Sequence, residues 1–225
     1  MTNARRTQAE RSAATIAKLV EATIEAIEQV GYHSTSLGEI SSRAGVSKAA
    51  VFRHFDSRMD LVVAAAGEVS RRHLAVVAEL RIPESITHPV DLAALMHLMR
   101  KQIRSDINTV WLELLVAART EPELRLRIAP VLRELYDELE ELAVSVLTPD
   151  VAPEAARLLA TSLIHMLDGE AILRTTYPRP ELEDARIDHV AAAFRALTGP
   201  TGPSSAHHRG DSKLDHVTSL GHARP

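Results

Sequence analysis

An aliphatic hydrophobic pattern repeats along this chain at three- and four-residue steps. It is clearest between Ile16 and Val30, where Gly31 follows as a helix stop. The same spacing returns in later segments, and no strand-like alternation of useful length occurs. Only seven of the 225 residues are Phe, Trp or Tyr, so the core must be built from Leu, Val, Ile and Ala. We therefore expect an all-α protein.

The pattern also predicts where the helices begin and end. The expected helices cover residues 12–30, 36–44, 47–55, 57–80, 121–147, 154–176 and 182–197, with further helical stretches at 92–99 and 110–118. Pro83, Thr87 and Pro89 indicate a loop between two regions. From Gly199 onward the chain holds almost no apolar residues, which is typical of a disordered tail. We expect an N-terminal domain over residues 11–71, a second domain over 72–199 and a tail over 200–225.

Composition excludes several classes of function. The chain has no cysteine, so disulfides, cysteine–zinc sites, iron–sulfur centres and thiol catalysis are ruled out. No Gly-rich phosphate loop, nucleophile elbow or paired-carboxylate motif occurs, so we expect neither an enzyme nor a cofactor or metal site. Residues 1–15 lack the apolar core of a signal peptide, and no apolar run is long enough to cross a bilayer. We therefore expect a cytoplasmic protein with no membrane partner.

The distribution of charge along the chain is more informative than the net charge. The net charge is −4, but residues 1–60 hold eight Lys and Arg against seven Asp and Glu, whereas the remainder holds 18 basic and 23 acidic residues. Within residues 46–55 there are two basic residues and no acidic one. A surface that faces phosphate needs only such a local excess, because salt screens distant charges.

Residues 36–55 predict two short helices joined by a tight turn. Ser36 and Glu39 have the spacing of a capping box at the start of the first helix. Gly45 can end that helix in a left-handed conformation that is cheap only for glycine. Ser47 can then cap the second helix, whose Val51 and Phe55 would face inward. Two such helices bury little surface by themselves, so they must pack on the longer helix before them.

The second short helix would then project a polar outer face. Its exposed residues are expected to be Ser47, Lys48, Ala49, Phe52 and Arg53. The DNA major groove accepts one helix, and a small residue such as Ala49 allows close approach. Lys48, Arg53 and His54 suit phosphates or base acceptors. The segment therefore predicts a DNA-binding helix-turn-helix.

The segment resembles the DNA-binding domain of the tetracycline-repressor (TetR) family of bacterial regulators. The resemblance spans roughly residues 12–61. It rests on Thr35, Ile40, the run Ala44–Ser47, the run Phe52–Phe55, Arg58 and Leu61. Three positions depart from the family pattern. Ser41 replaces a usual alanine, Ala49 replaces a usual glycine or proline, and Phe52 replaces a tyrosine that donates to a phosphate. Phe52 instead offers an apolar edge to a thymine methyl.

The resemblance implies a transcriptional regulator, most often a repressor that a small molecule releases from a palindromic operator. It implies DNA contacts by Ser36, Ser47, Lys48, Ala49, Phe52, Arg53, His54 and Arg58. It also implies that residues 72–199 bind the small-molecule effector and form a homodimer through the last two helices. The wide apolar surface of helix 154–176, with the small residues Ser162 and Gly169, independently favours such an interface.

Other signals leave alternatives open. Effector contacts are expected among Met96, Met99, Trp111, Tyr136, His165 and Met166, although residues of this kind are more often core. His165 and Asp168 could form a catalytic pair in an all-α enzyme, and the N-terminal unit could bind protein as an adaptor. Arg5, Arg6 and Arg11 could form an arm that reaches DNA. Alternatively, they could belong to a solvated terminus that makes no such contact. The tail histidines, His207, His208, His216 and His222, could bind metal adventitiously.

Overall fold

The computed structural model describes residues 7–79, 91–147 and 151–198, and all the secondary structure in these ranges is helical. This confirms the all-α prediction. The helices of these ranges are α1 (Gln8–Val30), α2 (Leu37–Arg43), α3 (Lys48–Val51), α4 (Arg58–Glu79), α5 (Leu92–Ile103), α6 (Asp106–Ala118), α7 (Pro122–Leu147), α8 (Pro153–Leu173) and α9 (Pro180–Thr198). The predicted loop at Pro83–Pro89 and the predicted tail at 200–225 lie outside the described residues.

Local capping sets the beginnings of the N-terminal helices. Helix α1 begins four residues earlier than predicted because Thr7 and Glu10 form a reciprocal capping box. Ser36 and Ser47 cap α2 and α3 as predicted, their hydroxyl oxygens accepting from backbone N–H groups at 3.1 and 3.2 Å. The predicted box at Ser36 is only half formed, because the Glu39 carboxylate accepts from Arg43 at 2.7 Å.

Helices α1, α2 and α3 form a small unit around their own apolar cluster. Its buried members are Leu19, Ala22, Ile40, Val51 and Leu61. Gly45 makes the turn between α2 and α3 at φ +65°, in the left-handed region that the sequence predicted. The turn lets the four-residue α3 lie against α2 with Val51 inward.

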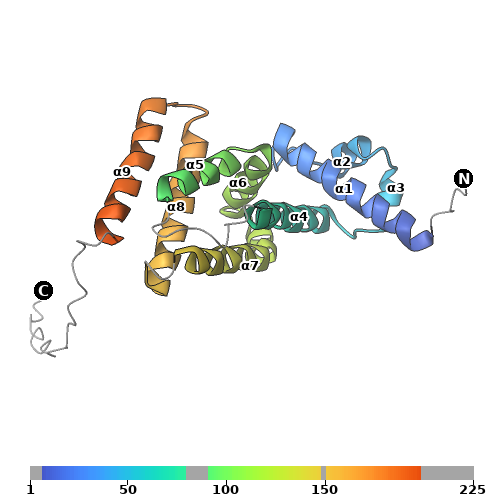
Figure 1. Ribbon diagram of the computed structural model, residues 1–225. Coiled ribbons are helices and arrows are strands. Elements are labelled where there is room, and N and C mark those ends of the chain that lie inside the picture. The colour runs from blue at the N-terminus through green and yellow to red at the C-terminus, as the bar shows by residue number, and fades with distance from the viewer. Residues whose placement is uncertain (1–6, 80–90, 148–150, 199–225) are drawn as a thin grey trace, which may run out of the picture.

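Two further clusters build the rest of the molecule. One joins α1 and α4 to α6 and α7, and the other joins α5 and the end of α7 to α8 and α9. Figure 1 shows the α1–α3 unit at one end and α8 and α9 at the other. The predicted domain boundary at residue 71 falls inside α4, which packs on α1 on one side and on α6 and α7 on the other. Across the described ranges, no helix combines the length and apolar content needed to span a membrane.

Candidate nucleic-acid interface and effector cavity

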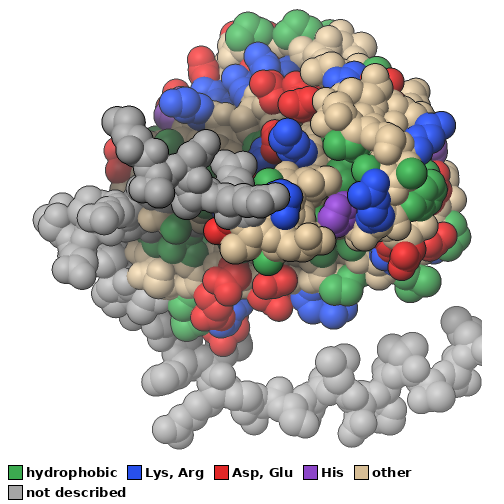
Figure 2. Space-filling model, turned by 90° about the vertical axis from the view of Figure 1, so that its right-hand side faces the viewer, with side chains coloured by type: hydrophobic (Ala, Val, Ile, Leu, Met, Phe, Trp, Pro, Cys, Tyr) green, Lys and Arg blue, Asp and Glu red, His purple; other side chains and the backbone are tan. Residues whose placement is uncertain are grey.

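The outer face of α3 and its following turn is exposed. Ser47, Lys48, Ala49, Phe52 and Arg53 all face solvent, and Phe52 keeps 53% of its surface accessible. Val51, on the opposite side, is only 1% exposed. Figure 2 looks onto this end of the molecule and shows Lys, Arg and His side chains near its centre, with Asp and Glu mostly toward its margins. The fold therefore presents the predicted face as a solvent-accessible ridge.

Lys48 leans from α3 toward the first turn of α2. A Cβ added at Gly38 would lie 3.7 Å from the Lys48 ammonium nitrogen and 3.5 Å from the Ser36 hydroxyl oxygen. The ammonium and the hydroxyl are thus neighbours on one surface, although 12 residues of sequence separate them. A single phosphate could contact both groups.

Two predicted DNA contacts have partners inside the protein. His54 is half-buried, with Nδ1 3.5 Å from the Ser12 hydroxyl of α1. Arg58 is turned toward the loop between α1 and α2, where its guanidinium donates to the backbone carbonyls of Tyr32 and Thr35. Its Cζ atom also lies 4.4 Å from the centre of the Tyr32 ring. This geometry gives Arg58 a positioning role in the turn, and its contact with DNA stays a prediction.

The same turn is tied to the second half of the molecule. The Tyr32 hydroxyl donates to Glu121 at 2.6 Å, and its backbone N–H donates to Glu113 at 3.2 Å. Burial, followed by the hydrogen bond to Glu121, raises the pKa of Tyr32 above its ordinary value. Arg127 of α7 reaches Asp60 of α4 at 2.5 Å. The sequence pattern gave no sign of these links, because each joins residues more than 60 positions apart.

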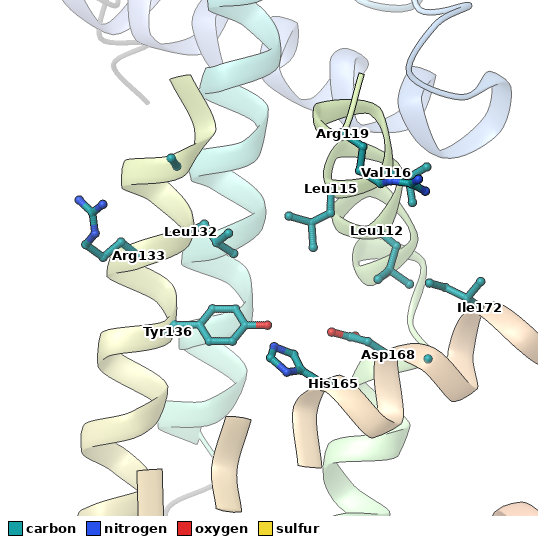
Figure 3. A pocket seen from close by; sticks show the side chains of 12 residues that line it. Leu112, Leu115, Val116, Arg119, Leu132, Arg133, Tyr136, His165, Asp168 and Ile172 are labelled. Atoms are coloured by element: carbon teal, nitrogen blue, oxygen red, sulfur yellow. The ribbon is translucent and has the colours of Figure 1, made fainter. Parts of the chain in front are cut away.

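A cavity of about 740 Å³ lies between α6, α7 and α8 (Figure 3). Each helix contributes side chains at three- and four-residue steps, so one face of each helix lines the space. The lining residues are Leu112, Leu115, Val116, Arg119, Ala129, Leu132, Arg133, Tyr136, His165, Asp168, Gly169 and Ile172. The volume lies in the range of small-molecule sites, roughly 300–1,000 Å³.

Of the six predicted effector contacts, Tyr136 and His165 line this cavity and the other four do not. Met96 is 0% exposed in the core between α5, α8 and α9, and Met99 and Met166 pack against the same cluster. Trp111 is 3% exposed in the core, with its ring edge-on to His73 at 6.2 Å. The reason is helix geometry: Leu112 and His165 face the cavity, so the adjacent Trp111 and Met166 point elsewhere.

Besides Arg119 and Arg133, three polar side chains line the cavity: Tyr136, His165 and Asp168. Burial, and then the charge of Asp168, raises the pKa of Tyr136 to about 12. Burial also raises the pKa of Asp168, although a hydrogen bond from the Asn108 amide at 3.2 Å opposes this. The rings of Tyr136 and His165 lie 5.8 Å apart, tilted by 39°.

The alternative of a catalytic His165–Asp168 pair finds no geometric support. Within the described residues no hydrogen bond joins the two side chains, and Asp168 is bonded to Asn108 instead. The same ranges contain no group of three or more His, Asp or Glu placed to hold a metal ion. Of the N-terminal arginines, Arg11 is exposed in α1, whereas Arg5 and Arg6 lie outside the described residues, as do the four tail histidines.

A capped three-helix unit that exposes its last helix, joined to a helical body with its own cavity, is the architecture of a helix-turn-helix regulator. The family model described as "Bacterial regulatory proteins, tetR family" matches residues 19–65. The chain is 35% identical over 192 residues to the HTH-type transcriptional regulator Rv2912c of Mycobacterium tuberculosis, covering 85% of this chain and 98% of the relative. It is 31% identical over 153 residues to the regulator CymR of Pseudomonas putida, covering 65% and 72% of the two chains.

Solved structures agree on the fold. A transcriptional regulator from Rhodococcus sp. Rha1 aligns with a TM-score of 0.63 at 23% identity, covering 80% of this chain and 95% of that one. The fatty acid degradation regulator FadR from Bacillus halodurans aligns with a TM-score of 0.57 at 18% identity, covering 88% and 99%. The chain belongs to the TetR family of bacterial transcriptional regulators, and its helix-turn-helix is a DNA-binding unit.

Proposed function

We propose that this regulator is a homodimeric repressor that a small molecule releases from a palindromic operator. The observation that carries the DNA-binding part is the exposed ridge of Ser47, Lys48, Ala49, Phe52 and Arg53, held in place by buried Val51. Each subunit inserts this ridge into a major groove, and the two half-sites lie about 34–36 Å apart or at a multiple of that distance.

Within this docking mode the side chains have separate tasks. Arg53 and Phe52 reach base edges, with Phe52 against a thymine methyl. Lys48 and Ser36 contact phosphate, and Ala49 lets the helix backbone approach. His54, restrained by Ser12, supports the end of the ridge.

A second copy of the chain would cover the apolar residues that one subunit leaves in solvent. Leu158 of α8 is 69% exposed and Leu173 is 62% exposed, and both lie at the end of the molecule opposite α3. Tyr177, between α8 and α9, and Leu182, in the first turn of α9, are exposed as well. Apolar side chains gathered in this way favour burial against a partner.

The effector would bind in the cavity between α6, α7 and α8. Val116 and Arg119 line this cavity and also a smaller one of about 210 Å³ beside His33. The end of α6 therefore borders both the effector cavity and the turn that carries Tyr32. An effector that binds one position of α6 more tightly than another would shift the spacing of the two α3 ridges.

The proposal is tested by footprinting the purified dimer on the intergenic DNA beside its own gene. We expect two protected half-sites related by a two-fold axis, with their centres about 10–10.5 base pairs apart or at a multiple of that spacing. Protection of a single site, or none at low salt, would contradict the dimeric docking. Loss of gene expression when the regulator is deleted would contradict the repressor assignment.

A further inference from the structure

Asp168 differs from two other carboxylates of the helical body, Glu170 and Asp60, because it has no Lys or Arg partner. The buried Glu170, two residues further along α8, is paired with Arg104 and Arg186, both at 2.6 Å. Asp60 is paired with Arg127 at 2.5 Å. Asp168 accepts only from the neutral Asn108 amide, and no ion pair joins it to a Lys or Arg within the described parts of the chain. A shielded carboxylate without a cation is costly and commonly marks a binding site.

The carboxylate of Asp168 is directed into the cavity. In Figure 3 it points toward the space between α6 and α7, and the hydroxyl end of Tyr136 points into the same space from the opposite side. His165 lies between them, one turn of α8 before Asp168. Three polar or aromatic groups therefore converge at one end of a space whose other walls are mainly aliphatic.

The two arginines that line the cavity stand apart from this cluster. Arg119 and Arg133 are both exposed, and in Figure 3 the Arg133 guanidinium points away from the cavity. Arg119 ends α6 and also borders the smaller cavity beside His33. Neither arginine pairs with Asp168. The ionisable side chain beside it is His165, whose electrostatic interaction lowers the pKa of Asp168, but burial is the larger effect and leaves that pKa raised. Among the described residues, this end of the cavity therefore presents an acceptor with no Lys or Arg paired to it.

We propose that Asp168 binds the positively charged group of an organic cation, and that this cation belongs to the class of effectors the regulator senses. The ligand is an amine or quaternary ammonium with a flat or branched apolar body. Its charge lies beside Asp168 and the Tyr136 ring, and its body lies against Leu112, Leu115 and Leu132. The identification of the ligand as an effector rests on the proposed function, whereas its binding does not.

Simple electrostatics favours a cation over the alternatives. An anion placed at this end would be repelled by the Asp168 carboxylate at close range. A neutral donor would satisfy one lone pair but leave the charge uncompensated. A cation gains both the ion pair and the negative face of the Tyr136 ring. The cavity thus selects for charge at one end and for apolar area along its walls.

The test measures binding of three fluorescent probes to the full-length protein. Proflavin is a flat cation at neutral pH, and 1-anilinonaphthalene-8-sulfonate is an anion. N-phenyl-1-naphthylamine is a neutral compound with the scaffold of the second probe but without its sulfonate group. Each is titrated into the wild type, into Asp168→Asn and into Glu154→Gln. Glu154 is an exposed carboxylate on α8 that does not line the cavity, so this control removes the same charge from the same helix.

We expect Asp168→Asn to weaken proflavin binding about tenfold or more, since one charged contact contributes about 1.4 kcal/mol or more. Binding of the neutral probe should change less than about twofold, and Glu154→Gln should match the wild type for every probe. The proposal is overturned if proflavin binds Asp168→Asn as tightly as the wild type. It is also overturned if the wild type binds the sulfonate probe as tightly as proflavin, or binds no proflavin.

Operator binding is measured in the same samples and separates this proposal from the proposed function. Asp168→Asn should bind the operator like the wild type when no probe is present, which also checks its fold. Because proflavin also intercalates into DNA, release is judged by comparing the wild type with Asp168→Asn at the same proflavin concentration. Selective binding of proflavin to the wild type with equal release from both proteins would support the cation site and contradict the effector role. Failure of the wild type and of every variant to bind DNA would contradict the repressor assignment. The probe titrations would then still test whether Asp168 binds a cation.

Discussion

The substitution Arg58→Lys separates a structural role from a DNA contact. Lysine keeps the positive charge but loses the planar guanidinium that donates to the carbonyls of both Tyr32 and Thr35. It also loses the stacking on the Tyr32 ring, whose centre lies 4.4 Å from the Arg58 Cζ atom. Because Arg58 belongs to the fold of the α1–α2 turn, we expect the variant to be less stable than the wild type.

The magnitude follows from these contacts. A hydrogen bond from a charged donor contributes about 1.5–3 kcal/mol, and a lysine can replace one of the two. The exposed part of the cation–π contact contributes about 0.5–1 kcal/mol. We expect the free energy of unfolding to fall by about 2–4 kcal/mol, or the melting temperature by about 4–16 °C for a chain of this size.

Urea unfolding followed by far-UV circular dichroism measures this change, at one protein concentration because a dimer's stability depends on it. Operator affinity is measured on the same variant under folding conditions. An Arg58→Lys protein that is as stable as the wild type, yet binds the operator about tenfold more weakly, would contradict a structural role for Arg58. Arg58 would then be the DNA contact that the sequence predicted.

Three further predictions concern single positions. Lys48→Ala should reduce the slope of log affinity against log salt by about one, and an unchanged slope would exclude a phosphate contact. Gly45→Ala should lower the free energy of unfolding, measured in urea, by about 1–2 kcal/mol because Gly45 has φ +65°. An added Cβ would meet nothing within 4 Å, so the loss would come from the backbone alone. An unchanged free energy of unfolding would argue against the left-handed turn. Burial lowers the pKa of His73 to about 4, from an ordinary value of 6.5. Below about pH 6.5 the unfolded chain therefore binds a proton at His73 that the native chain does not bind, and the free energy of unfolding falls. His73→Phe should therefore lose less stability than the wild type between pH 6.5 and pH 4, and parallel pH profiles would contradict this.

The sequence predicted the elements that depend on local rules. Ser36, Gly45 and Ser47 determine the capping and the turn of α2 and α3, and such effects act within a few residues. The start of α1 was predicted too late because the apolar pattern begins after the polar capping box at Thr7. Periodicity located the buried stripe but not the polar first turn that precedes it.

The cavity could not be located in the same way. Periodicity shows which residues share a helix face, but not which face meets a neighbour and which lines a space. Trp111 and Met166 looked like pocket residues by type, yet their neighbours Leu112 and His165 face the cavity. The role of Arg58 was hidden for a related reason, because its partners lie 23 and 26 residues away in the chain.

Docking of the α3 ridge on DNA is tested by comparing the operator affinities of Arg53→Ala and Lys101→Ala. Both variants remove one positive charge from an exposed side chain, the first on the α3 ridge and the second on α5. If the ridge enters the major groove, Arg53→Ala weakens binding about tenfold or more while Lys101→Ala stays near the wild type, with both proteins equally stable. Equal affinity of the two variants would contradict the docking of α3 on DNA.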